Sequence, residues 1–357
     1  MSNLFQPIHF KSGSSLKNRF MLAPLTNTQS HTDGRLSDDE YHWLTMRAKG
    51  GFGLTMTCAA HVQAVGQGFP GQLGIFGDEH LEGLTRLAKG IQAEDSLAVV
   101  QLHHAGMRSP EDLIGQAPVC PSDHEETGAV ALSSEAVEAL IEDFICAAER
   151  AEKAGFDGVE IHGAHGYILA QFLSATINQR QDQFGGSIEN RMRPITAIID
   201  GIRARCRPDF LLGLRLSPER FDVHLPDIIE VAKAILAAGK IDFLDMSLWD
   251  SFKEPEDEAY KGRSLLSYFT ELKRGDVALG IAGKLRNPEE VNRAMESGID
   301  FVMLGRAAIL HHDFPLQMQA DSNFTPVTNP VSADHLRAEG LGEAFITYMS
   351  GWKGFVG

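Results

Sequence analysis

Cysteine is scarce in this chain of 357 residues, and the placement of the four cysteines excludes several classes of metal and redox protein. Cys58, Cys120, Cys146 and Cys206 lie far apart, and no two of them form a C-x-x-C pair. The sequence therefore supplies neither a zinc ribbon nor the cysteines of an iron–sulfur cluster. Scattered cysteines also suit a reducing compartment, so we expect a cytoplasmic protein.

Long apolar runs and an excess of basic charge are lacking as well. No window approaches about 18 consecutive apolar residues, the length that spans a membrane. We also expect no secretory signal in the N-terminal segment MSNLFQPIHF. The 48 acidic and 32 basic residues give a formal net charge of -16. Because nucleic acids and anionic membranes bind basic patches, neither is an expected partner.

Low-complexity stretches, linkers and sequence repeats are missing too, but the chain has a repeated architecture. Short apolar runs predict strands at Arg19–Thr26, Leu54–Ala60, Leu97–His103, Gly158–His162, Leu211–Ser217, Phe243–Leu248, Val277–Ala282 and Phe301–Gly305. Amphipathic segments predict helices at Asp39–Lys49, Glu79–Ala93, Ser134–Ala154, Asn190–Arg203, Asp227–Ala238, Ser264–Arg274 and Glu289–Glu296. Capping residues agree with these limits, namely Ser37, Ser133 and Asn287 at helix starts and Gly50, Gly155 and Gly239 at helix ends.

Eight strands alternating with helices predict an α/β fold. The count of eight favours a closed (β/α)8 barrel, or TIM barrel, over an open doubly wound sheet. Such a barrel can occupy residues 1–357 as a single domain. The long polar stretch Met107–Leu132 after the third strand interrupts the rhythm, and we expect it to form a loop or lid over one end of the barrel. After the eighth strand we expect a C-terminal helical tail.

Two strand ends form a candidate phosphate site. Gly283 follows the seventh predicted strand and Gly305 follows the eighth, where barrels commonly bind a phosphate through backbone N–H groups. Arg306 adds a planar, permanently charged fork for phosphate oxygens. An arginine that merely caps the barrel rim is the alternative, and the placement on strands seven and eight favours phosphate.

Two other strands carry polar residues that could serve an electron-accepting ring. Arg215 shares one face of its strand with Gly213 and Ser217, and a fixed positive charge there would stabilise negative charge as it develops. A structural salt bridge explains Arg215 equally well. Gln101 lies two residues before His103 on the same face and offers both a donor and an acceptor.

The segment from His162 to Tyr167 is the most informative. H-x-x-H can be a metal pair, but we expect neither a carboxylate nor a third histidine nearby to complete a site, and therefore no metal. A satisfied core histidine remains an alternative. The functional interpretation uses His162 and His165 as donors that polarise a substrate carbonyl. Tyr167, with an ordinary pKa of about 10, would then supply a proton.

A longer signature surrounds this segment. It begins with the fourteen-residue run AGFDGVEIHGAHGY, Ala154 to Tyr167, and continues through Gln171-Phe172-Leu173-Ser174, Asn178, Arg180, Asp182, Phe184-Gly185-Gly186-Ser187 and Glu189-Asn190-Arg191. In these residues the chain resembles the old yellow enzyme family of flavin oxidoreductases. The resemblance extends from Leu4 to about Phe314, which is nearly the whole chain.

The resemblance implies a tightly bound, non-covalent FMN and a role for each candidate residue. The flavin edge and ring would contact Pro24, Leu25, Thr26, Ala59, Gln101 and Arg215, with Arg215 on the N1/O2 side of the ring. The phosphate would be held by Gly283, Lys284, Gly305 and Arg306. The substrate oxygen would be held by His162 and His165, and the proton donor would be Tyr167.

The implied activity is that of an ene-reductase. NADPH or NADH would reduce the flavin, and hydride from flavin N5 would reach an electron-poor alkene, such as an α,β-unsaturated carbonyl, that takes its proton from Tyr167. Nitro compounds or quinones are alternative acceptors. A dienoyl-CoA reductase would need clustered cysteines and an extra domain. The His162–Tyr167 set argues against a non-catalytic flavin carrier, which would not need these residues. The long signature argues against a flavin-free phosphate-binding aldolase or isomerase barrel.

The chain departs from the family pattern at four places, which are Met107 where an arginine is common, Ala175 where a proline is common, Phe184 for tyrosine, and Thr28 for an aromatic residue. Met107 removes a charge near the mouth of the site. None of these changes removes a catalytic group, although together they bear on the substrate range. Trp249 and Trp352 could shape the pocket or simply pack, and we favour packing. A homo-oligomer is possible, as among relatives.

Overall fold

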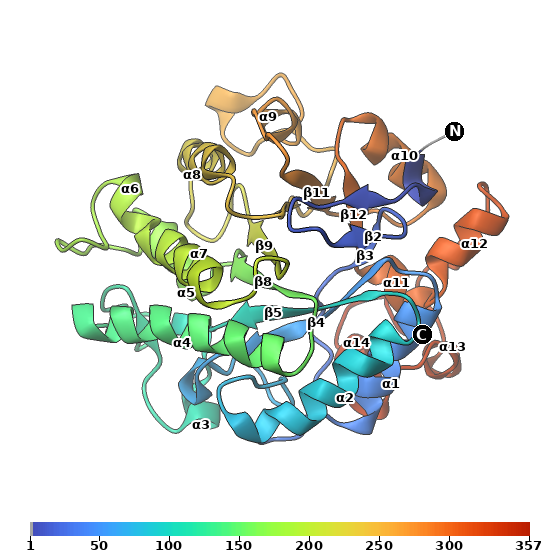
Figure 1. Ribbon diagram of the computed structural model, residues 1–357, viewed down its shortest axis with the longest axis horizontal. Helices are drawn as coiled ribbons and strands as arrows, with labels where there is room; N and C mark the ends of the chain where they lie inside the picture. Colours follow the sequence, from blue (N-terminus) through green and yellow to red (C-terminus); the bar gives the residue numbers. More distant parts are fainter. Residues whose placement is uncertain (1–2) are drawn as a thin grey trace.

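Eight parallel strands close into a barrel surrounded by helices in the computed structural model, which describes residues 3–357 (Figure 1). Around the barrel the strands are β3 (Phe20–Leu22), β4 (Leu54–His61), β5 (Leu97–His103), β8 (Gly158–Gly163), β9 (Leu211–Leu216), β10 (Phe243–Ser247), β11 (Ala278–Ala282) and β12 (Phe301–Leu304). The last strand pairs with the first through Met303 and Met21, which closes the barrel. The predicted (β/α)8 barrel is confirmed.

Helices follow the strands as the sequence predicts. They are α1 (Asp38–Lys49), α2 (Leu81–Gln92), α4 (Ser134–Lys153), α7 (Arg193–Arg205), α8 (Leu225–Ala238), α9 (Ser267–Thr270), α10 (Pro288–Glu296) and α11 (Arg306–Leu310). The side chains of Ser37, Ser133 and Asn287 each accept a hydrogen bond from a backbone N–H of the first turn, as their capping role requires. Gly239 ends α8 with a left-handed φ of 58°.

Three predicted elements differ from the structure by more than two residues at one or both ends. The first strand ends at Leu22 instead of Thr26, because Pro24 has no N–H for a ladder hydrogen bond. The predicted helix 264–274 is reduced to α9, and a local bond from Ser267 Oγ to the carbonyl of Ser264 (2.7 Å) competes with helix formation there. The predicted helix 190–203 is split into α6 (Ile188–Arg191) and α7, with Pro194 in the first turn of α7.

Apolar side chains fill the barrel interior at the end where the strands begin. Inward-facing residues of all strands except β8 form one buried cluster, among them Met21, Met56, Val99, Phe243 and Met303. An N-terminal hairpin, β1 (Ile8–His9) and β2 (Ser15–Leu16), adds Ile8, Phe10 and Leu16 to the same cluster. The hairpin therefore covers the end of the barrel at which the strands begin, and the other end remains for a site.

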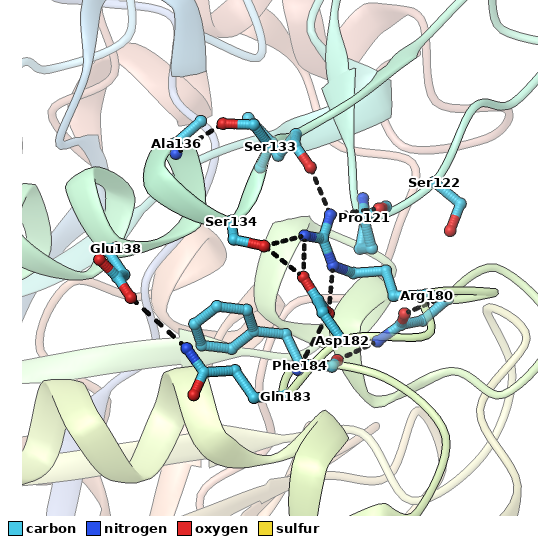
Figure 2. Close-up of polar contacts among 12 residues, drawn as sticks. Pro121, Ser122, Ser133, Ser134, Ala136, Glu138, Arg180, Asp182, Gln183 and Phe184 are labelled. Atoms are coloured by element: carbon cyan, nitrogen blue, oxygen red, sulfur yellow. Dashed lines mark hydrogen bonds and ion pairs between the residues drawn. The ribbon is translucent and has the colours of Figure 1, made fainter.

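Hydrogen bonds of two signature residues, Arg180 and Asp182, hold the segment 107–132 in place (Figure 2). Arg180 Nη1 donates to the carbonyls of Pro121 (2.9 Å) and Leu132. Asp182 accepts from Arg180 Nε (3.0 Å) and from Ser134 Oγ at the start of α4 (2.6 Å). The expected loop carries α3 (Glu111–Ile114) and a short ladder, β6 (Val119–Cys120) with β7 (Val130–Ala131). These signature residues thus stabilise the loop.

The chain after the barrel forms the expected helical tail. Its helices are α12 (Phe314–Ala320), α13 (Ala333–Ala338) and α14 (Glu343–Ser350). Trp43 of α1 packs edge-on against Phe345 of α14 with ring centroids 4.9 Å apart, so the tail is fixed to the outer helical layer (Figure 1). Among residues 3–357, no helix is long and apolar enough to cross a membrane.

Candidate active site

Two adjoining cavities lie at the carboxyl ends of the barrel strands. Their volumes are about 200 Å³ and about 310 Å³. Both are lined by Pro24, Leu25, His165, Arg215, Arg306 and Trp352, so they form one continuous hollow. Every site residue predicted from the sequence lines at least one of the two cavities. This is the end of a barrel at which enzymes place their catalytic groups.

Neighbouring strands bring three of these residues together. In the barrel register, Gln101 of β5 pairs with Glu160 of β8, and His162 of β8 pairs with Arg215 of β9. Side chains alternate along a strand, so Gln101, His162 and Arg215 all face the barrel interior. They line the smaller cavity together with Thr26, Ala59, Tyr167 and residues of α11 and α14.

A chain of hydrogen-bonded imidazoles lies beside the smaller cavity. His103 Nδ1 is 3.0 Å from His162 Nδ1, His162 Nε2 is 2.8 Å from His165 Nδ1, and His165 Nε2 is 2.8 Å from Ser247 Oγ. Burial lowers the pKa of all three imidazoles well below the ordinary value, so the rings are neutral at physiological pH. A chain of neutral imidazoles offers N–H groups to an oxygen without carrying charge.

His103 corrects one sequence-based argument. The expectation that no third histidine lies near His162 and His165 is wrong, because β5 brings His103 against His162. The signal was available, since Gln101 and His103 share the inward face of β5. The ring nitrogens bond to one another instead of converging on one point, and no group of three or more metal-binding side chains is found within residues 3–357.

The ring of Tyr167 packs against this chain of imidazoles. Its ring centroid is 4.4 Å from that of His103 and 5.1 Å from that of His162, both in edge-on contact. Burial raises the pKa of the Tyr167 phenol, and the nearby Arg108 guanidinium opposes that shift. The phenol therefore stays protonated at neutral pH, which is the state that a proton donor requires.

Arg108 restores the charge that Met107 was expected to remove. Its guanidinium carbon lies 4.7 Å from the Tyr167 ring centroid, and Arg108 Nη1 donates to the carbonyl of His165 (2.5 Å). The positive charge is thus one residue further along the chain than in the family pattern. Of the other departures, neither Thr28 nor Ala175 lines the two cavities.

The larger cavity ends in a set of free hydrogen-bond donors. The backbone N–H groups of Gly283, Lys284, Gly305 and Arg306 make no backbone hydrogen bond within the described residues. A side chain at position 283 would meet the backbone nitrogens of Asp250 and Ser251 at 3.1 Å, so glycine permits a close approach here.

Side-chain charge favours an anion at the same place. The acidic neighbour of Arg306, Glu290, pairs with Arg286 (3.1 Å), and Arg306 forms no ion pair among residues 3–357. Burial and the like charge of Arg286 lower the pKa of Arg306, so an anion that neutralised the guanidinium would be favoured. The ammonium group of Lys284, a predicted phosphate ligand, pairs with Asp250 (2.9 Å).

Aromatic residues form the rim of the hollow. Trp249 is 58% exposed and Trp352 is 43% exposed, and both line the larger cavity. Our preference for simple packing of these two tryptophans is therefore wrong. Tyr348 and Met349 of α14 line the smaller cavity, so the C-terminal tail supplies one wall of the site. Nothing in the local sequence indicated this role for Tyr348 and Met349.

The chain matches the NADH:flavin oxidoreductase / NADH oxidase family over residues 3–323. A probable NADH-dependent flavin oxidoreductase of Bacillus subtilis, YqiG, is 36% identical over 326 residues, covering 88% of this chain and 87% of its own. An NADPH dehydrogenase of the same bacterium is 31% identical over 92% of this chain and 97% of its own. The solved old yellow enzyme homologue of Zymomonas mobilis has a TM-score of 0.79 at 27% identity, covering 94% of this chain and 96% of that one.

The donors in the two cavities fit the cofactor of this family. Free backbone N–H groups beside Arg306 suit a phosphate. The Gln101 amide and the Arg215 guanidinium suit the polar edge of an isoalloxazine ring. From fold, site and relatives together, the chain belongs to the NADH:flavin oxidoreductase / NADH oxidase family, with FMN as its cofactor and a nicotinamide nucleotide as its reductant.

Proposed function

We propose that this protein is an ene-reductase, which reduces the C=C bond of α,β-unsaturated carbonyl compounds and similarly activated alkenes. The observation that carries the proposal is the contact of Tyr167 with His162 (5.1 Å between ring centroids) beside a cavity that His165 also lines. FMN, when bound, supplies hydride to the acceptor. The protein's own side chains then have to polarise the acceptor and protonate it.

The imidazoles provide the polarising donors. Both ring nitrogens of His162 are engaged by other imidazoles, so a substrate oxygen would take the place of the bond between His162 and His165 (2.8 Å). Two N–H groups would then draw electron density from the carbonyl as the enolate-like transition state forms. His103 contributes by orienting His162, because its hydrogen bond to His162 Nδ1 fixes the orientation of that ring.

Tyr167 provides the proton. Its phenol is protonated, lines the same cavity, and is held by edge-on contact with His103 and by the Arg108 guanidinium over its ring. A protonated phenol beside the polarised acceptor can deliver its proton to the α-carbon. Reduction of a quinone or a nitro group needs no proton at carbon, so retention of this phenol favours alkenes over those alternative acceptors.

The proposed cofactor contacts follow the two cavities. The flavin ring would be held by Pro24, Leu25, Thr26, Ala59, Gln101 and Arg215, and the phosphate by Gly283, Lys284, Gly305 and Arg306. Lys284 would first have to release Asp250 or act through its backbone N–H alone. The alternative of a flavin-free aldolase or isomerase barrel is ruled out by the family.

The test separates the two halves of the reaction. The holoprotein is reduced anaerobically with NADH or NADPH and then reoxidised in a stopped-flow instrument with enones, maleimides, quinones and nitro compounds. We expect saturable reoxidation by enones and maleimides with formation of the saturated product. Fast reoxidation by quinones or nitro compounds, without any reaction with enones or maleimides, would contradict the proposal and favour the alternative acceptors.

A further inference from the structure

Beneath the two cavities lies a buried polar cluster that the proposed reaction does not use in full. It consists of Gln101 on β5, Glu160 on β8, Arg215 on β9 and Asp245 on β10, all at most 5% exposed. Gln101 Nε2 donates to Glu160 Oε2 (2.6 Å), and Arg215 Nε lies 2.8 Å from Asp245 Oδ2. Each pair therefore joins one residue of the cavity lining to one carboxyl group below it.

The surroundings of this cluster are apolar. The charged groups that act on Glu160 are Asp245 from β10 and Arg215 from β9, and β5 adds only the neutral amide of Gln101. The other strands present apolar side chains to the barrel interior, including Met21, Ala23, Met56, Ala282 and Met303. His162, next to Glu160 along the inward face of β8, is neutral because burial lowers its pKa.

The cluster has two carboxyl groups and one cation, so one carboxyl group lacks a balancing positive charge. Arg215 contacts Asp245 directly, so Asp245 is the carboxylate of the ion pair. A second buried carboxylate would have no cation to balance it, which is costly in an apolar interior. Burial and the Asp245 charge raise the pKa of Glu160, and its Oε1 has no hydrogen-bond partner among the described residues. An O–H on that oxygen is the arrangement with the lower free energy.

We propose that Glu160 is a positioning residue that acts on the flavin ring as a neutral carboxylic acid. Its hydrogen bond fixes the Gln101 amide, and its neutrality leaves Arg215 paired with a single carboxylate, so that the floor of the site has no net charge. This inference rests on the proposed placement of the flavin ring against Gln101 and Arg215. It adds a residue that lines neither cavity and acts through its hydrogen bond to Gln101.

The protonation state of Glu160 should make the flavin midpoint potential depend on pH. Reduction adds negative charge to the ring, and an ionised Glu160 beneath it would oppose that charge. Below the pKa of Glu160 the group is neutral and has no such effect. Above that pKa the carboxylate makes reduction harder, so the flavin midpoint potential falls more steeply with pH than it would without Glu160.

The experiment compares the holoprotein with two isosteric variants, Glu160→Gln and Asp245→Asn, by measuring the flavin midpoint potential across pH. Glu160→Gln keeps a neutral group of the same shape, so it should match the parent at low pH and lie above it at high pH. At high pH and fixed ambient potential, the reduced-to-oxidised flavin ratio in the parent should be lower by about tenfold or more. Asp245→Asn removes the charge that opposes ionisation of Glu160, so the pH above which the potential falls more steeply should move to lower values.

Infrared spectroscopy of the same proteins supplies a readout of Glu160 alone. The parent should show a carboxylic-acid C=O band that disappears in Glu160→Gln and, in the parent, at high pH. Absence of that band from the parent at neutral pH would overturn the inference, because Glu160 would then be ionised. A band without any difference in potential between parent and Glu160→Gln would also overturn it. Neither result depends on which acceptor the enzyme reduces, so the proposed ene-reductase activity is tested separately.

Discussion

The reactivity of Tyr167 is set by burial and by the neighbouring Arg108 guanidinium. Burial alone would hold the phenol proton more tightly, and the guanidinium 4.7 Å above the ring weakens that hold. The same arginine donates to the backbone of His165. One side chain thus acts on both the proposed proton donor and a proposed carbonyl donor, although no sequence pattern linked Arg108 to either.

Tyr167→Phe should separate the two half-reactions. The ring keeps its edge-on contacts with His103 and His162, so the fold and the FMN content should be unchanged. Flavin reduction by the nicotinamide needs no proton from this group and should keep its rate. Reoxidation by an enone does need one, and it should slow by about 10²–10⁴-fold.

Stopped-flow measurement of each half-reaction checks this prediction. Quinones should still reoxidise the variant at the parental rate, which provides the internal control. Parental rates with enones would mean that water or another residue donates the proton.

At the level of the elements, the alternation of strands and helices was predictable because each strand is a short apolar run and because α1, α4 and α10 begin at capping residues. Contacts between strands were harder to foresee. The alternation on β9 placed Arg215 inward, but its pairing with Asp245 depends on the register of β9 with β10. That register does not follow from a local pattern, whereas the inward face shared by Gln101 and His103 could have indicated the approach of His103 to His162.

The backbone conformation at the strand ends could not be predicted from the sequence either. His165, Trp249 and Lys284 adopt left-handed φ values of 60°, 63° and 52°, and all three line the larger cavity. Non-glycine residues rarely adopt this conformation, and it costs roughly 1–2 kcal/mol per residue. Such strain is tolerated where the surrounding barrel fixes the backbone, and it gathers at functional sites.

Trp352, at the end of the C-terminal tail, should limit the size of the acceptor. Trp352, which follows α14, lines both cavities while 43% exposed, so Trp352→Ala should open the site with little loss of stability. We expect bulky cyclic enones to gain in kcat/KM relative to small ones. The matched control is Leu316→Ala on α12, which removes an equally exposed apolar side chain (46%) away from the cavities.

Steady-state kinetics with enones of graded size checks this prediction. An unchanged order of preference in Trp352→Ala would show that the tail does not limit the size of the acceptor.

At the scale of the whole molecule, the overall charge and the local charge of the site have opposite signs. The chain has a formal net charge of -16, whereas the larger cavity is lined by Lys284, Arg286 and Arg306. An anionic cofactor is therefore repelled at long range and depends on these local cations and on free backbone N–H groups. Arg306 is the member of this set that forms no ion pair within residues 3–357.

FMN bound to the folded barrel should stabilise the whole molecule by mass action. A ligand that binds only the folded state, at a concentration of about 100 times its Kd, adds about 2.7 kcal/mol to the free energy of unfolding. Removing FMN should therefore lower Tm, and adding it back should restore Tm in a concentration-dependent way. Arg306→Ala loses a charge-assisted bond worth on the order of 1.5–3 kcal/mol, so more FMN should be needed for the same rise in Tm.

The control for Arg306→Ala is Arg337→Ala, which removes a surface arginine paired with Asp334 and Glu343 on the C-terminal tail. Exposed ion pairs contribute little, so Arg337→Ala should keep the parental dependence of Tm on FMN concentration. Thermal unfolding across an FMN titration of all three apoproteins makes the comparison. If Arg306→Ala follows the parental curve, Arg306 does not hold the phosphate, and the backbone N–H groups of Gly283 and Gly305 would have to bind it without the guanidinium.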